Sequence, residues 1–384
     1  MNPLLQTLIT IGVVFGAVLG TCAYLVLLER KVSARMQDRI GPNRVGPWGL
    51  LQPLADGIKL VLKEDPTPAH VDKFLFQIAP MISVFTTLLA FAVVPFGPVG
   101  QAPPFMRFIV APNIDVGIVF IFAITSLAVY GVILGGWASN NKYSMLGSLR
   151  ASAQVVSYEI PLGMSVLGIA LLTGSLNLEQ ILMQQADGGF WNWNFWFQPM
   201  ACLVFFTSAL AESNRMPFDL PECEQELVGG YHTEYGGFRF AMFFLGEYVH
   251  VVTVSFLMSI LFFGGWQFPW IATPESAYAG AWLVKIGVLL MKVAAMIVFI
   301  MLIRWTIPRF RFDQLMGLAW KVLIPLSLAN VVIVMTVLQF GWNRWWLLAI
   351  SVALFLVAGV MGVNAKRLEI SRRPRASRPA AFVT

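Results

Sequence analysis

Long uncharged apolar runs recur along the whole of the 384-residue chain. Residues 1–28 carry no charged side chain, and neither do residues 74–106. A helix needs about 20 consecutive apolar residues to cross a bilayer, so runs of this length predict transmembrane helices. The pattern predicts nine of them, near residues 4–28, 76–95, 116–137, 151–173, 197–211, 240–263, 281–303, 322–340 and 345–364. We therefore expect an all-α polytopic membrane protein with about nine transmembrane helices.

The overall composition supports this fold class. Hydrophobic residues make up 58% of the chain and charged residues 12%. Soluble domains average about 45–50% and about 25%, respectively. The first apolar run has neither the basic start nor the cleavage site of a secretory signal, so we interpret it as a retained span. We expect residues 1–365 to form a single transmembrane domain.

The distribution of basic residues predicts the orientation of the chain. Of the 26 Lys and Arg residues, Arg107 and Arg344 alone fall in the loops after the second and eighth spans, and Lys285 and Lys292 lie inside the seventh. Basic residues favour the cytoplasmic side, so the N-terminus is predicted outside and the C-terminus in the cytoplasm. The cytoplasmic loops are then residues 29–73, 138–150, 212–239 and 304–321.

The first of these loops contains a short amphipathic segment. Its apolar and charged side chains separate onto two sides of a helix, with Leu50, Leu54, Ile58 and Val61 on one and Asp56, Lys59 and Lys63 on the other. Pro53 suits the first turn of such a helix. We expect this helix to lie flat in the membrane interface on the cytoplasmic side. A loop that only anchors the chain to lipid remains the alternative.

Residues 366–384 form a basic tail, in which six Lys and Arg residues stand among Pro, Ser and Ala. We expect this tail to be disordered and to be held near anionic lipid by its charge. Nucleic-acid binding is the weaker explanation for such a run, so nucleic acid is not expected as a partner.

Acidic residues gather in one loop, between the fifth and sixth spans. Residues 212–234, which we call the acidic hairpin, hold six of the 20 acids of the chain. These are Glu212, Asp219, Glu222, Glu224, Glu226 and Glu234. Charge is costly beside hydrocarbon, and such groups usually mark ion or proton routes. The hairpin therefore predicts proton movement or a site for a polar ligand.

Two further acids lie within predicted spans, Glu159 in the fourth and Glu247 in the sixth. A charge at mid-membrane costs roughly 2.5–3.5 kcal/mol on insertion scales, so the presence of each acid within a span requires a structural or functional explanation. A neutral, hydrogen-bonded Glu that joins two helices is the alternative, but the nearby hairpin favours a proton route. Within the seventh span, Lys285 could snorkel outward, whereas the deeper Lys292 could pair with Glu159.

The sequence does not predict a metal or nucleotide site of its own. The three cysteines, Cys22, Cys202 and Cys223, form no CxxC pair, and the three histidines are scattered. Iron–sulfur clusters and zinc both require closely spaced ligands. A glycine-rich phosphate loop after a strand is also missing from the sequence. Any redox chemistry is therefore expected on a partner chain.

Four motifs resemble a known family. They are ERKVSARMQDRIGPNRVGPWGLLQPLADGIKL at 29–60, AQVVSYEIPLG at 153–163, AESNRMPFDLPECEQELVGGYHTEYGGFRFAMFFLGEY at 211–248 and RWTIPRFRFDQLMGLAWKVLIPLSLAN at 304–330. The chain resembles the H subunit of proton-pumping NADH:quinone oxidoreductase, respiratory complex I, whose mitochondrial counterpart is NADH dehydrogenase subunit 1. The resemblance runs from the first span through the eighth and leaves out the ninth span and the basic tail.

The resemblance implies a place at the junction of the membrane arm and the peripheral redox arm of that complex. There the family member forms part of the quinone chamber, and it links the reduction of ubiquinone or a similar quinone to proton translocation. The iron–sulfur cluster and the flavin would belong to partner subunits of the peripheral arm. Other membrane-arm subunits would be neighbours in a bacterial cytoplasmic (inner) membrane.

The resemblance also assigns roles by position. The proton-route acids of the family match Glu159, Glu212 and Glu247. The hairpin acids near the chamber match Asp219, Glu222, Glu224, Glu226 and Glu234. Positions near the quinone opening and tunnel match Arg30, Arg35, Arg39, Asp56 and Phe244. Arg304 and Arg309 match the basic loop at the interface between the two arms.

Two other classes of function remain open from the sequence. The related membrane subunit of energy-converting hydrogenases shares the fold without using quinone, but the ELVGGYHTEY and GPNRVGP segments favour the quinone enzyme. A stand-alone transporter or ion channel is the second alternative. Carriers that work by alternating access often show an inverted repeat, and none is evident in this sequence.

Overall fold

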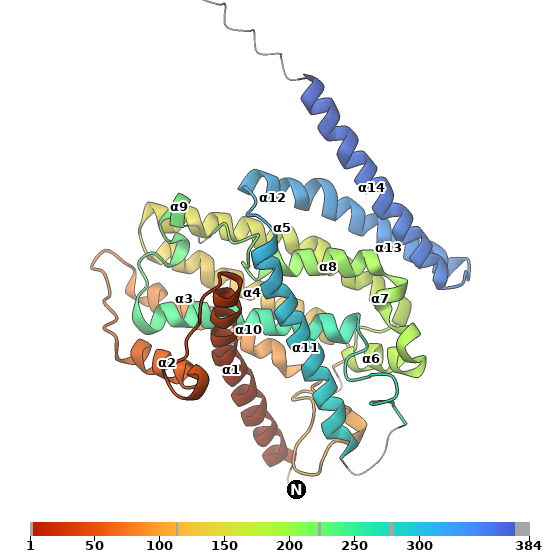
Figure 1. Ribbon diagram of the computed structural model, residues 1–384, viewed down its shortest axis with the longest axis horizontal. Coiled ribbons are helices and arrows are strands. Elements are labelled where there is room, and N and C mark those ends of the chain that lie inside the picture. Colours follow the sequence, from red (N-terminus) through yellow and green to blue (C-terminus); the bar gives the residue numbers. More distant parts are fainter. Residues whose placement is uncertain (1–2, 113, 222–223, 276–279, 373–384) are drawn as a thin grey trace, which may run out of the picture.

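The computed structural model describes residues 3–112, 114–221, 224–275 and 280–372, and for residues 224–225 and 361–372 it describes the backbone alone. Within these ranges the chain is helical, apart from loops and an isolated bridge between Phe268 and Ala272. Long apolar helices dominate the structure (Figure 1). The prediction of an all-α polytopic membrane protein is confirmed.

Seven helical stretches in the described part are long and apolar enough to cross a membrane. They are α1 (Pro3–Met36), α3 (Lys73–Leu89) with the adjoining η2 (Ala90–Ala92), α4 (Gly117–Ala138), α5 (Lys142–Thr173), α10 (Gly237–Leu261), α11 (Ala281–Thr306), and α12 (Phe312–Leu318) continued by η6 (Ala319–Leu323) and α13 (Ile324–Gln339). Shorter apolar helices, α8 (Pro199–Glu212) and the first part of α14 (Trp345–Arg372), occupy the predicted fifth and ninth spans.

Short elements connect these helices. They are η1 (Pro47–Gly49), α2 (Gln52–Leu62), η3 (Val99–Gln101), α6 (Leu178–Asp187), η4 (Gly189–Asn192), α7 (Asn194–Phe197), α9 (Glu224–Leu227) and η5 (Gly230–His232). The expected amphipathic helix is confirmed as α2, with Pro53 in its first turn. Leu54, Ile58 and Val61 are exposed on its outer side, which suits contact with lipid.

Several helices extend beyond their apolar cores. α5 begins at Lys142, so most of the loop expected at 138–150 is helical. The reason is a cap, because the side chain of Asn141 accepts a hydrogen bond from the backbone N–H of Tyr143 at 2.9 Å. α14 likewise continues to Arg372, past the start of the basic tail, and residues 373–384 lie outside the described part.

α10 is the central helix of the bundle. Every residue from Tyr248 to Leu261 is buried, as is typical of a helix that is apolar on all sides. α3, α8, α11 and α1 pack around it (Figure 1). A polar side chain between Tyr248 and Leu261 therefore faces protein on all sides and cannot reach lipid.

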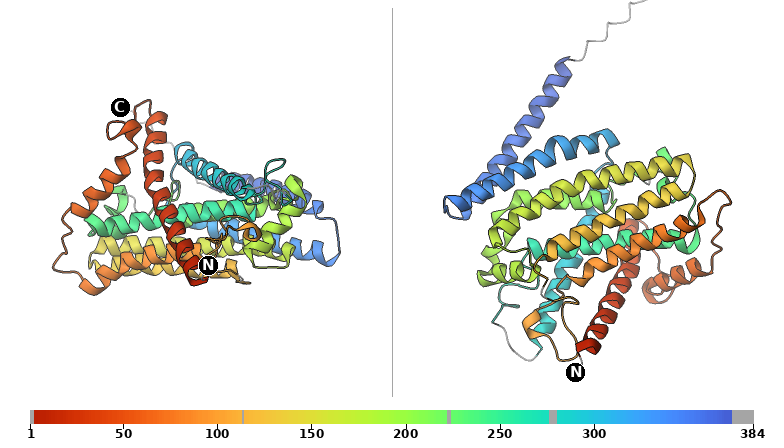
Figure 2. Two further views of the ribbon diagram at one scale, coloured as in Figure 1. Left: turned by 90° about the horizontal axis from the view of Figure 1, so that it is seen from below. Right: turned by 180° about the vertical axis from the view of Figure 1, so that it is seen from behind.

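α1 and α2 lie on one face of this bundle. α1 crosses α3 and α10 obliquely, and α2 lies beside the end of α1 and the start of α10 (Figure 2). Such a crossing leaves space between helices that would otherwise pack along their length.

Several loops, including the acidic hairpin, lie together at one end of the bundle. We call this end the loop end. The backbone N–H of Asp72 donates to the carbonyl of Ala138 at 3.1 Å, and the Asn140 amide donates to the carbonyl of His70 at 3.1 Å. The hairpin packs directly on α5, because a Cβ added to Gly147 would lie 2.6 Å from Cα of Gly230. Glycine is therefore required for this approach.

The two lysines of α11 lie near the opposite end, and both expectations for them are wrong. Lys292 donates to the carbonyls of Phe263 and Gln267 at 2.6 and 2.5 Å, and does not pair with Glu159. Both carbonyls lie in the loop that follows the last residue of α10, Leu261, and a backbone carbonyl oxygen can accept a hydrogen bond from an ammonium group. Lys285 is fully buried and does not snorkel, because its ammonium donates to the Gln101 side chain at 3.0 Å.

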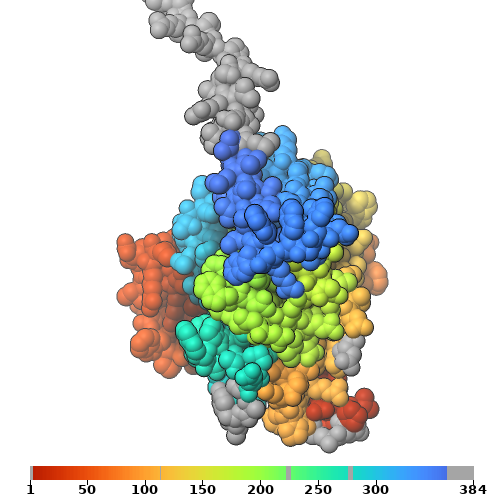
Figure 3. Space-filling view, turned by 90° about the vertical axis from the view of Figure 1, so that its right-hand side faces the viewer, coloured from red at the N-terminus to blue at the C-terminus, as the bar shows by residue number. Residues whose placement is uncertain are grey.

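The C-terminal helices form one side of the molecule. α13 and the first turns of α14 pack against α8, and α14 also contacts α7 (Figure 3). Leu347 is buried in this contact, whereas Phe355, Leu356 and Val360 further along α14 are exposed. This helix therefore presents an apolar surface beyond the bundle.

Candidate functional site

An apolar cavity of ≈ 290 Å³ lies between α1, α2 and α10. Its wall combines aliphatic and aromatic side chains with a few polar ones. The lining residues are Leu19, Cys22, Ala23, Val26, Leu27 and Arg30 of α1, Gln52, Pro53, Asp56, Gly57 and Leu60 of α2, and Phe238, Ala241, Met242, Phe244, Leu245 and Tyr248 of α10. Such a cavity suits a long apolar molecule with a polar group at one end.

The charged groups of this cavity belong to one ion pair. Arg30 Nη1 lies 2.6 Å from Asp56 Oδ2, and the two side chains are 49% and 30% exposed. Gln52 donates a further hydrogen bond to Asp56 Oδ1 at 2.9 Å. Exposed pairs of this kind contribute about 0–1 kcal/mol. Their effect here is to fix α2 against α1 and to place polar atoms at the cavity wall.

Behind the apolar wall, Glu29 forms a buried ionic cluster. Its carboxylate accepts from Arg215 Nη1 at 3.3 Å and from the Tyr248 hydroxyl at 2.5 Å, and it also contacts Arg304. The Glu29 side chain is 9% exposed. The cluster joins four separate parts of the chain, namely α1, the acidic hairpin, α10 and the end of α11.

Arg215 is the innermost base of this cluster. Its guanidinium lies over the Tyr248 ring, 4.1 Å from the ring centroid, a cation–π contact. Burial acts to lower the pKa of Arg215, but the neighbouring Tyr248, Glu29 and Glu247 outweigh burial and hold that pKa above its usual range. Arg215 is therefore a permanent buried cation that interacts electrostatically with both Glu29 and Glu247.

A second, polar cavity of ≈ 50 Å³ lies within the bundle between α3, α4, α5, α8 and α10. Its walls carry hydroxyl, carboxyl and imidazole groups. Lining residues include Ser83, Thr87, Thr125, Glu212, Ser213, Asn214, Tyr231, Glu247 and His250. The predicted acids Glu212 and Glu247 are thus brought together here from different helices.

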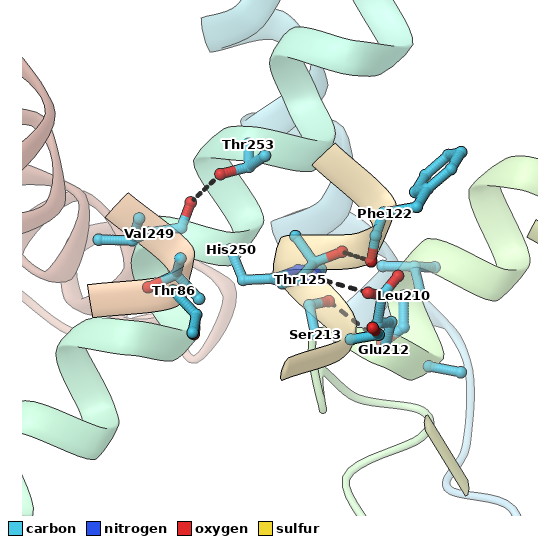
Figure 4. Close-up of polar contacts among 12 residues, drawn as sticks. Thr86, Phe122, Thr125, Leu210, Glu212, Ser213, Val249, His250 and Thr253 are labelled. Carbon is cyan, nitrogen blue, oxygen red and sulfur yellow. Dashed lines mark hydrogen bonds and ion pairs between the residues drawn. The ribbon is translucent and has the colours of Figure 1, made fainter. Parts of the chain in front are cut away.

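Both acids of the polar cavity have close partners. Tyr231 donates its hydroxyl to Glu247 Oε1 at 3.1 Å. Glu212 Oε1 lies 3.1 Å from His250 Nε2, and Figure 4 shows this pair between α8 and α10. The end of α8 is held by Gln154 of α5, whose amide donates to the carbonyls of Ala211 and Phe218 at 2.8 and 2.9 Å.

α10 approaches α3 very closely at this cavity. A Cβ added to Gly246 would lie 2.9 Å from the Ser83 hydroxyl oxygen. The absence of a side chain at Gly246 therefore allows this close approach of the two helices.

Glu159 is near this cavity but does not line it. It is partly buried on α5, and its charge interacts with that of Glu212. Among the described residues, Glu159 makes neither a hydrogen bond nor an ion pair. The three predicted route acids therefore lie in one neighbourhood, with Glu159 at its edge.

The other hairpin acids tie the hairpin to the bundle. Asp219 pairs with Arg309 at 3.3 Å, and Glu226 pairs with Arg150 at 2.6 Å. Glu234 accepts from the Asn141 amide at 2.7 Å. Glu222 lies outside the described residues, and for Glu224 the backbone alone is described.

The predicted basic and aromatic residues divide into two groups. Arg30, Asp56 and Phe244 line the apolar cavity, and the Phe244 ring packs edge-on to Tyr248 at 4.7 Å. Arg35 and Arg39 are exposed at the end of α1 and just after it, and line neither cavity. Arg304 and Arg309 each contact an acid of the same chain, Glu29 and Asp219 respectively.

The sequence analysis did not predict four residues of the site, namely Glu29, Arg215, Tyr248 and His250. Two of them have a feature in the sequence that could have identified them. Glu29 is the first charged residue after 28 uncharged ones, and His250 follows Glu247 at helical spacing within a span. The pairing of Glu29 with Arg215 joins positions 186 residues apart and has no local signature.

Comparison with known proteins now decides the family. A family described as NADH dehydrogenase matches residues 9–335. The chain belongs to this family. It is similar to the NADH-quinone oxidoreductase H subunit 2 of Koribacter versatilis, with 49% identity over 342 residues, covering 86% of this chain and 96% of the relative.

Other relatives in the NADH dehydrogenase family give the same picture. The NADH-quinone oxidoreductase H subunit of Protochlamydia amoebophila is 49% identical over 311 residues, covering 81% of this chain and 91% of the relative. NADH-quinone oxidoreductase subunit 8 of Thermus thermophilus is 46% identical over 335 residues, covering 87% of each chain. The expected resemblance is confirmed. α14 lies beyond the stretch that matches the family.

Proposed function

We propose that this chain is the H subunit of a bacterial NADH-quinone oxidoreductase. In this role it forms the membrane-side part of the quinone chamber and links quinone reduction to proton translocation. The relatives carry the name of that complex, which supports the assignment of its sister subunits as partners. Flavin and iron–sulfur clusters would be carried by those partners, with quinone as the substrate.

One observation carries the proposal: α10 is a shared wall between an apolar cavity and a polar one. Phe244 and Tyr248 line the apolar side, and Glu247 and His250 line the polar side. An apolar quinone tail fits the first environment, and proton carriers fit the second. Tyr248 and Arg215 lie between the two, through their contact with each other and with Glu29.

The buried charges provide an electrostatic link between quinone reduction in the apolar cavity and protonation in the polar cavity. A reduced quinone gains two electrons and takes up two protons, so negative charge develops near the chamber before protonation. Arg215 interacts with Glu29 and with Glu247, so a new negative charge that attracts Arg215 weakens its hold on both. At an effective dielectric of about 20, a unit charge 4 Å away contributes about 4 kcal/mol. This is enough to change the protonation of a carboxyl group.

The remaining assignments follow from position. Glu159, Glu212 and Glu247 would carry protons away from the chamber, and Arg30, Asp56 and Phe244 would frame the opening to the membrane. The loop end, with the hairpin acids Asp219, Glu222, Glu224, Glu226 and Glu234, would face the cytoplasm and the peripheral arm. Arg35, Arg39, Arg304 and Arg309 would lie at or near that interface.

The test is Glu247→Gln in the assembled complex. We expect loss of NADH:quinone reductase activity and proton pumping, with NADH:ferricyanide activity retained because that step occurs in the peripheral arm. Glu179→Gln is the matched control, since Glu179 lies at the start of α6 and lines neither cavity. Full quinone reduction and pumping in Glu247→Gln would refute the route at this residue. If the wild-type complex itself reduces no quinone, a hydrogenase-type assembly is favoured instead.

A further inference from the structure

His250 is a buried titratable group that the three-acid route leaves out. It lies three residues after Glu247 on α10, so the two side chains share one face of that helix. Both line the polar cavity. Figure 4 shows the imidazole directed from α10 toward Glu212, the last residue of α8. His250 therefore lies beside both acids that line the cavity.

The contact with Glu212 uses one ring nitrogen. Nε2 lies 3.1 Å from Glu212 Oε1, and the two side chains are 9% and 7% exposed. The other nitrogen, Nδ1, is buried and has no hydrogen-bond partner among the described residues. Buried polar atoms are nearly always hydrogen-bonded, so an orphan nitrogen in a polar cavity points to a bound water.

The cavity around Nδ1 can hold such a water. Its volume of ≈ 50 Å³ exceeds the roughly 10–15 Å³ that one water requires. The Thr87 and Thr125 hydroxyls in its wall donate to carbonyls of their own helices, at 3.0 and 3.2 Å, so their oxygens remain free to accept. Glu247 lines the same space.

We propose that His250 carries protons between the Glu247 side of the polar cavity and Glu212. This inference rests on the proposed function, because it adds a fourth member to the same route. In each passage Nδ1 accepts a proton from cavity water, that water regains a proton from the Glu247 carboxyl group, and Nε2 releases its own proton to the Glu212 carboxylate at Oε1. No electrons move in this step. The ring then holds its proton on Nδ1. Before the next passage Nε2 takes up a proton from water and Nδ1 releases one to water, which restores the Nε2–H tautomer.

An imidazole is suited to this position by its two nitrogens. One nitrogen can accept a proton while the other donates one. The titratable groups that face His250 are Glu212 on α8, Glu247 on α10 and Tyr231 on η5, while α3 and α4 present hydroxyls. A histidine that only clamps α10 to α8 is the competing role.

The decisive variants are His250→Asn and His250→Gln in the assembled complex. Both keep an amide that can donate to Glu212, but neither can exchange a proton. We expect quinone reduction coupled to pumping to fall about a hundredfold, the low end of the contribution of positioned proton-transfer groups. NADH:ferricyanide activity should be retained. His70→Asn is the matched control, because the His70 side chain is exposed at the loop end.

A third variant separates proton transfer from clamping. His250→Ala leaves space beside Glu212, and added imidazole should restore coupled activity in a saturable way, whereas pyrrole, which has no basic nitrogen, should not. The restored activity should rise with the neutral, proton-accepting form of imidazole as pH increases. The proposal would be overturned if His250→Asn or His250→Gln kept wild-type coupled activity. It would also be overturned if added imidazole failed to restore coupled activity to His250→Ala.

The outcome also distinguishes this inference from the proposed function. If Glu247→Gln blocks coupled quinone reduction while His250→Asn leaves it intact, the inference about His250 fails alone. If neither substitution changes quinone reduction or pumping, the proton route itself is wrong.

Discussion

The buried cluster around Glu29 gives a prediction that can be worked out in numbers. Glu29→Gln removes the negative charge that lies 3.3 Å from Arg215 Nη1 and leaves that cation buried over the Tyr248 ring. The amide is close in size to the carboxylate, so the packing is conserved. The change therefore acts on charge and leaves shape almost unaltered.

The size of the effect follows from distance and burial. At 3.3 Å and an effective dielectric of about 20, the lost attraction is about 5 kcal/mol. Removing one partner of a buried pair typically costs about 3–5 kcal/mol. We take the lower end, about 3 kcal/mol, because solvent reaches part of the cluster through Arg304, whose side chain is 37% exposed.

Hydrogen–deuterium exchange of the assembled complex measures this locally. Amides around Arg215, and at the end of α1, should exchange on the order of 100-fold faster in Glu29→Gln, because each 1.4 kcal/mol is about tenfold. Amides of α6 serve as an internal reference. In the double variant Glu29→Gln/Arg215→Gln both buried charges are gone, so exchange should return most of the way toward wild type. Unchanged exchange in the single variant, or additive effects in the double, would refute the ionic explanation of this cluster.

Two further predictions test the cavity wall and the seat of the hairpin. Asp56→Asn removes the partner of Arg30 at 2.6 Å, so the KM for long-tailed quinones should rise, up to about fivefold for a partly exposed pair, while short-tailed quinones are unaffected. Unchanged kinetics would leave α2 as a lipid anchor. Gly147→Ala puts a Cβ 2.6 Å from Cα of Gly230, so limited proteolysis should cut the hairpin faster. Gly163→Ala on the same helix meets nothing within 4 Å and is the control; equal cleavage of the two variants would contradict the close packing.

The apolar pattern was sufficient to predict the helices, because membrane spans depend on hydrophobicity summed over many residues. It could not predict their ends. α5 starts at Lys142 because the Asn141 side chain caps it. The short π-helix η6 joins α12 and α13 into a single span. The ends of a helix depend on one or two hydrogen bonds, and these hardly change the hydrophobicity summed over a whole span.

The candidate site was predictable where chemistry is unusual for its surroundings. Glu247 and Glu212 were identified because an acid within or beside a membrane span is energetically costly and is therefore usually functional. The structure places both in one cavity. Lys292 was recognised as out of place, but its partner was not Glu159. It binds the backbone carbonyls of Phe263 and Gln267, and the position of a loop carbonyl in three dimensions cannot be predicted from composition. Arg215 was not predicted because it lies in the acidic hairpin, where six acids dominate the charge pattern and a single base is not distinctive.

A single helix that borders both cavities has a thermodynamic corollary for inhibitors. If a compound lodged against Phe244 and Tyr248 changes the proton affinity of Glu247, linkage requires that protonation of Glu247 changes the affinity of the compound by the same factor. Potency measured at one acidity would then not transfer to another. The dissociation constant of a tail-mimicking blocker, followed across pH, would report on carboxyl groups that the blocker never touches.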